Sequence, residues 1–179
     1  MRATHLLLPI ALLLAGPGPK VAVLPIDLNN IHKTAPDSAF AGRLARLGEA
    51  LRHRLAGCGY RVVGVDRAME AGGEAPEGYF YDHPDVAAGI ARRAGAEWVV
   101  VPRLNRASAW AADLQAHVVR VSDAAVVSNR IVEFKGLELT PELAARLTER
   151  GSAWMADQLA QAIDHARDPT GDPPRRCPA

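Results

Sequence analysis

Hydrophobic positions along the chain fall into short apolar runs that alternate with helical stripes. Val21–Ile26 is apolar and predicts a strand, and the polar segment Asp27–Ser38 after it predicts a long loop. Apolar residues then recur three or four positions apart, which predicts an amphipathic helix with one buried stripe: Phe40, Leu44, Leu47, Leu51 and Leu55. Gly57 or Gly59 can end this helix in a left-handed turn.

The middle of the chain repeats this strand-and-helix order. Apolar and polar residues alternate over Tyr60–Val65, which predicts a short strand, and Asp66–Tyr81 is predicted to be irregular. A helix is predicted from Pro84 to about Ala94, because proline suits the first helical position and Gly95 can end the helix. Glu97–Pro102 is nearly all apolar, as expected of a strand covered on both faces. The residues expected to point inward from the helix are Val86, Ile90 and Ala94.

The last third predicts a hairpin followed by a helix. Ala111–Ser122 and Ala124–Lys135 alternate around a tight connection, which favours two antiparallel strands. The final helix opens at Pro141, with an expected buried face of Leu143, Leu147, Trp154 or Met155, Leu159 and Ile163. The element order βαβαβββα therefore predicts an α/β fold in which a mixed sheet of about five strands carries helices packed on it.

The first residues predict export. Leu6–Ala15 is apolar and follows Arg2, and it is shorter than the roughly 20 residues that span a bilayer. We expect residues 1–19 to be a signal peptide cleaved near 15–19, residues 20–166 to form one domain, and the Pro-rich tail 167–179 to be disordered. The expected location is the periplasm or the exterior, with an uncleaved leader acting as an anchor as the alternative.

Charge and cysteine content narrow the classes of function. Of the 21 basic residues only Arg2 lies in the leader, so the expected mature chain has 20 basic and 20 acidic residues. This balance gives no general attraction to nucleic acid or anionic lipid. Cys58 and Cys177 are the two cysteines, and in an oxidising compartment they either form one disulfide or remain two free thiols.

One candidate site lies at the carboxyl ends of the predicted strands. Asp27, Asn29, Asp66 and Arg103 all approach that edge, where open α/β sheets bind ligands. The alternative is that Asp and Asn stand there only because they favour turns.

A second candidate is the cluster from Tyr79 to Asp85. Asp82, His83 and Asp85 offer oxygen and nitrogen ligands to a divalent metal, or His83 or Asp82 caps the helix while Asp85 faces its positive end. Tyr79 and Tyr81 could form a contact surface for a partner protein.

Four segments together resemble an exported bacterial family of unknown function, of the domain-of-unknown-function 3280 or 2380 type. They are Val21–Ile26, the leucine-striped helix, Gly59–Val63 and Ala87–Val101. They are also similar to the amino-terminal domain of TolB and to domains of curli-secretion and penicillin-binding-protein-activator lipoproteins. The resemblance implies a non-catalytic docking or assembly module. Pro102 departs from the glycine that this family often has after its third strand.

We therefore expect an exported, non-catalytic accessory protein of the cell envelope that binds another envelope protein through Asp27–Ser38 and Tyr79–Asp85. The sequence contains neither a Gly-x-Ser-x-Gly nor a His-Glu-x-x-His motif, so no enzyme activity and no cofactor are expected. The alternative is a periplasmic protein that binds a small ligand or a metal. Oligomeric state is left open.

Overall fold

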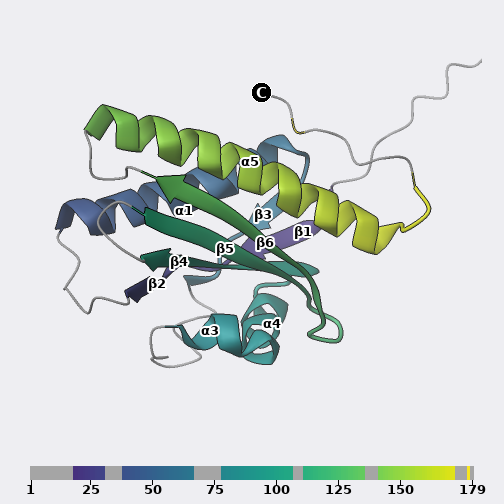
Figure 1. The fold of residues 1–179 in the computed structure, drawn as a ribbon. Coiled ribbons are helices and arrows are strands. Elements are labelled where there is room, and N and C mark those ends of the chain that lie inside the picture. The colour runs from purple at the N-terminus through teal and green to yellow at the C-terminus, as the bar shows by residue number, and fades with distance from the viewer. Residues whose placement is uncertain are drawn as a thin grey trace, which may run out of the picture.

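A mixed six-stranded sheet forms the centre of the protein, with helices on both faces (Figure 1). The structure, a computed structural model, describes residues 18–30, 38–66, 78–106, 111–135, 141–171 and 177. The strands are β1 (Lys20–Val23), β2 (Asp27–Asn30), β3 (Arg61–Val63), β4 (Trp98–Arg106), β5 (Ala111–Arg120) and β6 (Val126–Lys135). The helices are α1 (Ser38–Gly57), α3 (Tyr79–Asp82), α4 (Pro84–Arg93) and α5 (Pro141–Arg167).

The strand order confirms the α/β fold with a mixed sheet. The strands follow the order β3-β1-β4-β5-β6, and β2 pairs separately with β4. β1 is parallel to β3 and β4, whereas β5 is antiparallel to β4 and β6. The first half thus has the crossovers that alternating strands and helices predict, and the second half has the predicted hairpin.

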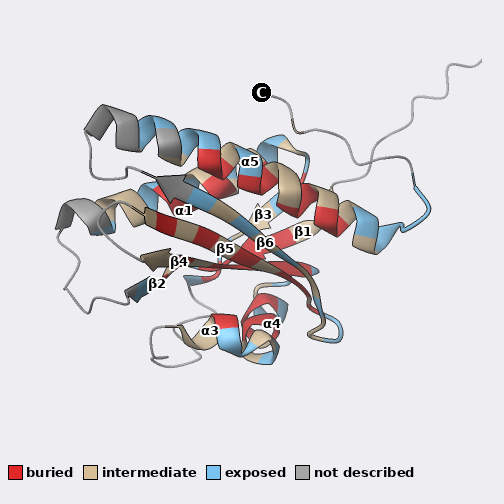
Figure 2. Ribbon diagram, in the orientation of Figure 1, coloured by how far each residue is buried: buried red, intermediate tan, exposed pale blue. Residues whose placement is uncertain are grey.

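Two apolar clusters sandwich the sheet, one on each face (Figure 2). α1 and α5 cover one face, where Val100 and Leu114 point, and α3 and α4 lie on the other, where Val99 and Val119 point. Neighbouring positions of a strand therefore go to opposite clusters, as pleating requires. This alternation also decides which polar side chains of β4 and β5 reach the α3 side.

The prediction that Asp27 opens a long loop was wrong for its first four residues, which form β2. The chain leaves the sheet at Leu24–Ile26 and then resumes pairing with β4, opposite Arg103–Arg106. Turn preference of Asp and Asn is a local effect, and the ladder hydrogen bonds with β4 override it. The rest of the expected loop, residues 31–37, lies outside the described residues.

Pro102 lies inside β4 without interrupting it. The Leu24 amide donates to the Val100 carbonyl at 3.0 Å, so the backbone groups of Val100 face β1, and those of Pro102, two positions on, face the same side. That side is where β1 has ended and β2 has not begun. The missing N–H of Pro102 therefore has no ladder partner to lose, which explains why the proline is tolerated.

α1 confirms the leucine-striped helix, since Leu47, Leu51 and Leu55 are buried. Its end is a Schellman motif, in which the Gly59 amide donates to the Ala56 carbonyl at 3.0 Å and the Tyr60 amide donates to the Leu55 carbonyl at 3.2 Å. Gly59 has a φ of 90°, so it supplies the left-handed turn that the sequence predicted for Gly57 or Gly59.

We predict opposite effects of alanine at these two glycines. Gly59→Ala places a Cβ in the left-handed region and should lower the free energy of unfolding by about 1 kcal/mol. Gly57→Ala, in the last turn of α1 with open space around it, should raise it by about 0.5 kcal/mol. Urea denaturation of both variants measures the two changes, and equal effects would contradict this assignment of the turn.

Two helical details differ from the sequence predictions, and a third decides between two residues that they left open. Tyr79–Asp82 forms the short helix α3 within a segment expected to be irregular up to Tyr81. In α4, Ile90 is buried as expected, but Val86 and Ala94 are only partly buried; the other buried residues are Ala87, Ala88 and Ala91. In α5, Met155 faces the sheet and Trp154 is 45% exposed. The side chains of Leu143 and Leu147 lie outside the described residues.

The two cysteines are joined in the structure. Cys58, just after α1, forms a disulfide with Cys177, and their Cα atoms are 4.7 Å apart, within the usual range for such bonds. The bridge fixes Cys177, ten positions after α5 ends, beside the α1–α5 cluster. No helix among the described residues is long and apolar enough to cross a membrane. Residues 1–17, and most of the tail after Gly171, lie outside the described residues.

Candidate functional site

Arg103 forms the centre of a polar junction at the carboxyl ends of the strands. It follows Pro102 in β4, lies opposite Asp27 of β2 in the ladder, and points to the α3 side of the sheet. Its Nε is 3.6 Å from Asp27 Oδ2, and the two side chains are 12% and 14% exposed. The sequence therefore correctly placed Asp27 and Arg103 near each other, and the unforeseen strand β2 fixes the distance between them.

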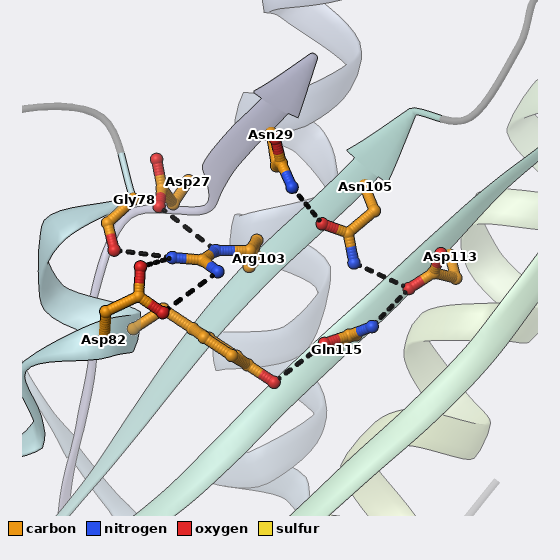
Figure 3. Close-up of polar contacts among 9 residues, drawn as sticks. Asp27, Asn29, Gly78, Asp82, Arg103, Asn105, Asp113 and Gln115 are labelled. Atoms are coloured by element: carbon orange, nitrogen blue, oxygen red, sulfur yellow. Dashed lines mark hydrogen bonds and ion pairs between the residues drawn. The ribbon is translucent and has the colours of Figure 1, made fainter. Parts of the chain in front are cut away.

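Arg103 also holds α3 against the sheet (Figure 3). Its Nη2 donates to the Gly78 carbonyl at 2.6 Å and to Asp82 Oδ2 at 2.9 Å, and its Nη1 donates to Asp82 Oδ1 at 3.3 Å. This is the two-pronged contact that a planar guanidinium makes with a carboxylate. One side chain thus connects β2, β4 and α3.

Gly78 is needed at the entry to α3 for two reasons. Its φ is 83°, a conformation that residues with a Cβ rarely adopt. A Cβ built there would also lie 3.0 Å from Arg103 Nη2. The glycine lets the backbone carbonyl approach the guanidinium closely.

Tyr81 is buried, which corrects the expectation that Tyr79 and Tyr81 form an exposed contact surface. Its ring lies 4.2 Å from the Arg103 guanidinium carbon and stacks on the His117 ring at a centroid distance of 3.9 Å. Its hydroxyl donates to Gln115 Oε1 at 2.9 Å and lies 3.2 Å from Asn129 Oδ1. Burial raises the pKa of Tyr81, so the phenol stays neutral.

A chain of side-chain hydrogen bonds continues from this junction across three strands. Asn29 Nδ2 of β2 donates to Asn105 Oδ1 of β4 at 3.0 Å, and Asn105 Nδ2 donates to Asp113 Oδ1 of β5 at 2.9 Å. Gln115 Nε2 donates to the same oxygen of Asp113 at 2.9 Å. We call the residues of this chain and of the junction the polar sheet face: Asp27, Asn29, Gly78, Tyr81, Asp82, Arg103, Asn105, Asp113, Gln115, His117 and Asn129.

The charges of the polar sheet face are largely compensated by neighbours. Hydrogen bonding to Arg103 lowers the pKa of Asp82, whose side chain is 65% exposed. Burial, and then the charge of Arg103, lower the pKa of His117 below its usual value. The Arg103 guanidinium donates hydrogen bonds to Asp82 and to the Gly78 carbonyl, and it forms an ion pair with Asp27 in which neither Nε nor Oδ2 has a hydrogen-bond partner among the described residues. The junction is therefore suited to holding elements together and to presenting an ordered polar surface.

The lowered pKa of His117 predicts a loss of stability in mild acid. The folded state binds a proton at His117 less readily than the unfolded chain does. The contribution of His117 to the free energy of unfolding is therefore fully present above about pH 6.5, and it is lost as the pH drops toward the lower folded pKa. Arg103, Tyr81 and Asp82 are the charged or titratable groups that act on the ring. His117→Gln should flatten the decline in unfolding free energy between pH 7 and 5; an unchanged decline would contradict the assignment.

The structure gives the proposed metal ligands other environments. Asp82 binds Arg103, the His83 ring lies against the Tyr79 ring in a tilted contact with centroids 4.1 Å apart, and Asp85 lies in the first turn of α4. His83 is the N-cap of α4, but its side chain makes no capping hydrogen bond. Among the described residues, the one group of three close potential ligands is Cys58, Asp157 and Cys177, whose cysteines are disulfide-bonded.

Asp66 does not join the residues with which it was grouped. It is exposed, three positions after β3, and among the described residues it makes no contact with the Arg103 junction. Sequence reasoning missed Gly78, Asn105, Asn129, Asp113, Gln115 and His117. The alternation of β5 could have revealed the last three, because Asp113, Gln115 and His117 fall on one face opposite the buried Leu114 and Ala116.

Solved structures with a similar fold include three bacterial proteins. They are the LpoB C-terminal domain from Salmonella enterica (TM-score 0.50, 20% identity, 66% of this chain and 84% of that chain), a PelC dodecamer from Paraburkholderia phytofirmans (0.50, 18%, 80% and 88%), and TolB from Acinetobacter baumannii (0.50, 14%, 85% and 29%). This chain thus matches less than a third of the TolB chain, and at these identities the likeness concerns the fold alone.

The sequence itself gives the family. No curated protein matches it. Residues 19–138 match the family described as "Protein of unknown function (DUF2380)", which confirms the resemblance seen in the strand and helix motifs. That match includes every residue of the polar sheet face and extends over more than half of the chain. The chain belongs to the DUF2380 family of proteins of unknown function.

Proposed function

We propose that this protein is a non-catalytic module of the bacterial cell envelope that binds another envelope protein through the polar sheet face. The observation that carries the proposal is the hydrogen-bonded chain from Asn29 through Asn105 and Asp113 to Gln115 and Tyr81. Its members come from four separate elements, and their side chains are already fixed by one another. An ordered surface loses little side-chain entropy when a partner binds, which favours recognition.

The chemistry of the junction supports binding over catalysis. The Arg103 guanidinium forms ion pairs with two carboxylates and a hydrogen bond with a carbonyl, and the neighbouring Tyr81 has a raised pKa. A nucleophile needs a lowered pKa or an adjacent base. Similarity to LpoB and PelC structures agrees with a fold that serves in assemblies, since one of those structures is a dodecamer. Export to the periplasm or the exterior is part of this proposal, and the apolar residues Leu6–Ala15 support it.

Site-specific photo-cross-linking in intact cells tests the proposal. A photoreactive phenylalanine replaces Asn29 or Ile131, which are both exposed on the α3 side of the sheet, or Trp154, which is exposed on α5 at the opposite face. Asn29 is the terminal member of the hydrogen-bonded chain, so its replacement removes the bond to Asn105 but leaves the bonds among the other members in place. We expect one discrete adduct, the same protein from positions 29 and 131, and none of it from position 154. Adducts of equal yield from all three positions, or none from the first two, would overturn the proposal.

A further inference from the structure

β6 is the outermost strand on one side of the sheet, and its outer edge pairs with no other strand among the described residues. It is ten residues long, whereas β3, at the opposite edge, has three. Short strands, prolines and covering elements are the usual protection of such edges. Within the described part of the chain, β6 has no proline, and β5 is the strand with which it pairs.

One side of β6 exposes apolar side chains. Val126 pairs with Val119 and Ile131 with Gln115, so both point to the α3 side of the sheet. Val126 is 43% exposed and Ile131 is 49% exposed, and they are two of the three large hydrophobic residues left open among the described residues. Apolar side chains on an edge strand favour the addition of a further strand.

The other side of β6 carries a half-buried cation, Arg130. Arg130 lies opposite Ala116, whose side chain is buried in the α5-side cluster, so Arg130 points toward α5. Its side chain is half-buried, its Nε is buried, and Nε has no hydrogen-bond partner among the described residues. A buried N–H group without a hydrogen-bond partner is costly, because it has lost its water without gaining an acceptor.

We infer that the open edge of β6 binds an extended segment of the partner protein, in which apolar and acidic residues alternate. Such a segment adds a further strand to the sheet. Its apolar side chains would cover Val126 and Ile131 on one face, and a carboxylate on the other would pair with Arg130. The inference rests on the proposed function in that it names the kind of partner segment that this binding module takes.

Two synthetic peptides provide the test. One alternates valine and glutamate over ten residues, the other alternates valine and lysine, and each carries a fluorophore for anisotropy titration against the full chain. The glutamate peptide should bind at least about tenfold more tightly, because a charge-assisted pair is worth that difference. Bound peptide should also slow hydrogen exchange at backbone amides of β6.

Matched charge reversals assign the effect to Arg130. Arg130→Glu should reverse the preference toward the lysine peptide, whereas Arg150→Glu, at an exposed position of α5, should leave it unchanged. The inference is overturned if the peptides bind equally, if both reversals have the same effect, or if exchange in β6 does not change. It is also overturned if size-exclusion chromatography shows that this edge joins two copies of the chain.

Failure of these peptides would not by itself remove the proposed function. The cross-links from Asn29 report on the β2 end of the polar sheet face, which β4 and β5 separate from β6. Cross-linking at Asn29 without peptide selectivity would overturn the edge-strand inference alone. Loss of both signals would overturn the binding module itself.

Discussion

Arg103→Ala is expected to lower the free energy of unfolding by about 3 kcal/mol. The substitution leaves Asp27, whose side chain is 14% exposed, and the Gly78 carbonyl without their common partner, and it removes the guanidinium from the Tyr81 ring. Breaking a mostly buried ion pair by removing one member is strongly destabilising, because the other charge remains. The contact with Asp82 adds little to this loss, since that carboxylate is 65% exposed. Urea denaturation measures the change.

Arg120→Ala is the matched control. Arg120 also forms an ion pair, with Asp123 at 2.9 Å, but the two side chains are 39% and 50% exposed. Its loss should cost about 0.5 kcal/mol. If the two variants lose the same stability, Arg103 does not hold β2, β4 and α3 together in the way described.

Cys58→Ser is expected to lower the free energy of unfolding by about 3–4 kcal/mol under oxidising conditions. The disulfide joins residues separated by 119 positions, and a bridge that closes a long loop restricts the unfolded chain most. It also connects the end of α1 to Cys177, beyond α5, so its loss releases the end of the chain from the α1–α5 cluster. Thermal or urea unfolding with and without a thiol reductant measures the effect.

The pair can be separated from general damage by a double variant. Cys177→Ser should lose as much stability as Cys58→Ser, and the variant with both substitutions should lose no more than either alone. A reductant should destabilise only the original chain. Additive losses, or equal sensitivity of all variants to the reductant, would contradict a disulfide in the folded protein.

The sequence predicts most of the framework because hydrophobic periodicity reports burial. The leucines of α1 and the apolar run of β4 each have a pattern that one secondary structure satisfies, and both were predicted correctly. β2 was missed because Asp27 and Asn29 are poor strand formers. Their pairing depends on β4, more than seventy positions away along the chain.

The polar site was predictable only where strand ends define it. Asp27 and Arg103 follow from the rule that parallel strands end at one edge. Tyr81 was misjudged because an aromatic residue beside Asp82 and His83 has the local pattern of an exposed loop. Its burial depends on Gln115 of β5 and Asn129 of β6, whose side-chain oxygens are hydrogen-bond acceptors for its hydroxyl. No local pattern indicates such contacts.

The most direct test of the central claim, that the Arg103 junction organises a binding surface, is cross-linking from position 29 in the Arg103→Ala chain. The measurement is made at a temperature where circular dichroism shows that the variant is folded, with the probe at position 154 as background. The account predicts that the discrete adduct formed by the original chain disappears while the background is unchanged. An undiminished adduct would show that the partner binds without the junction and would contradict the account.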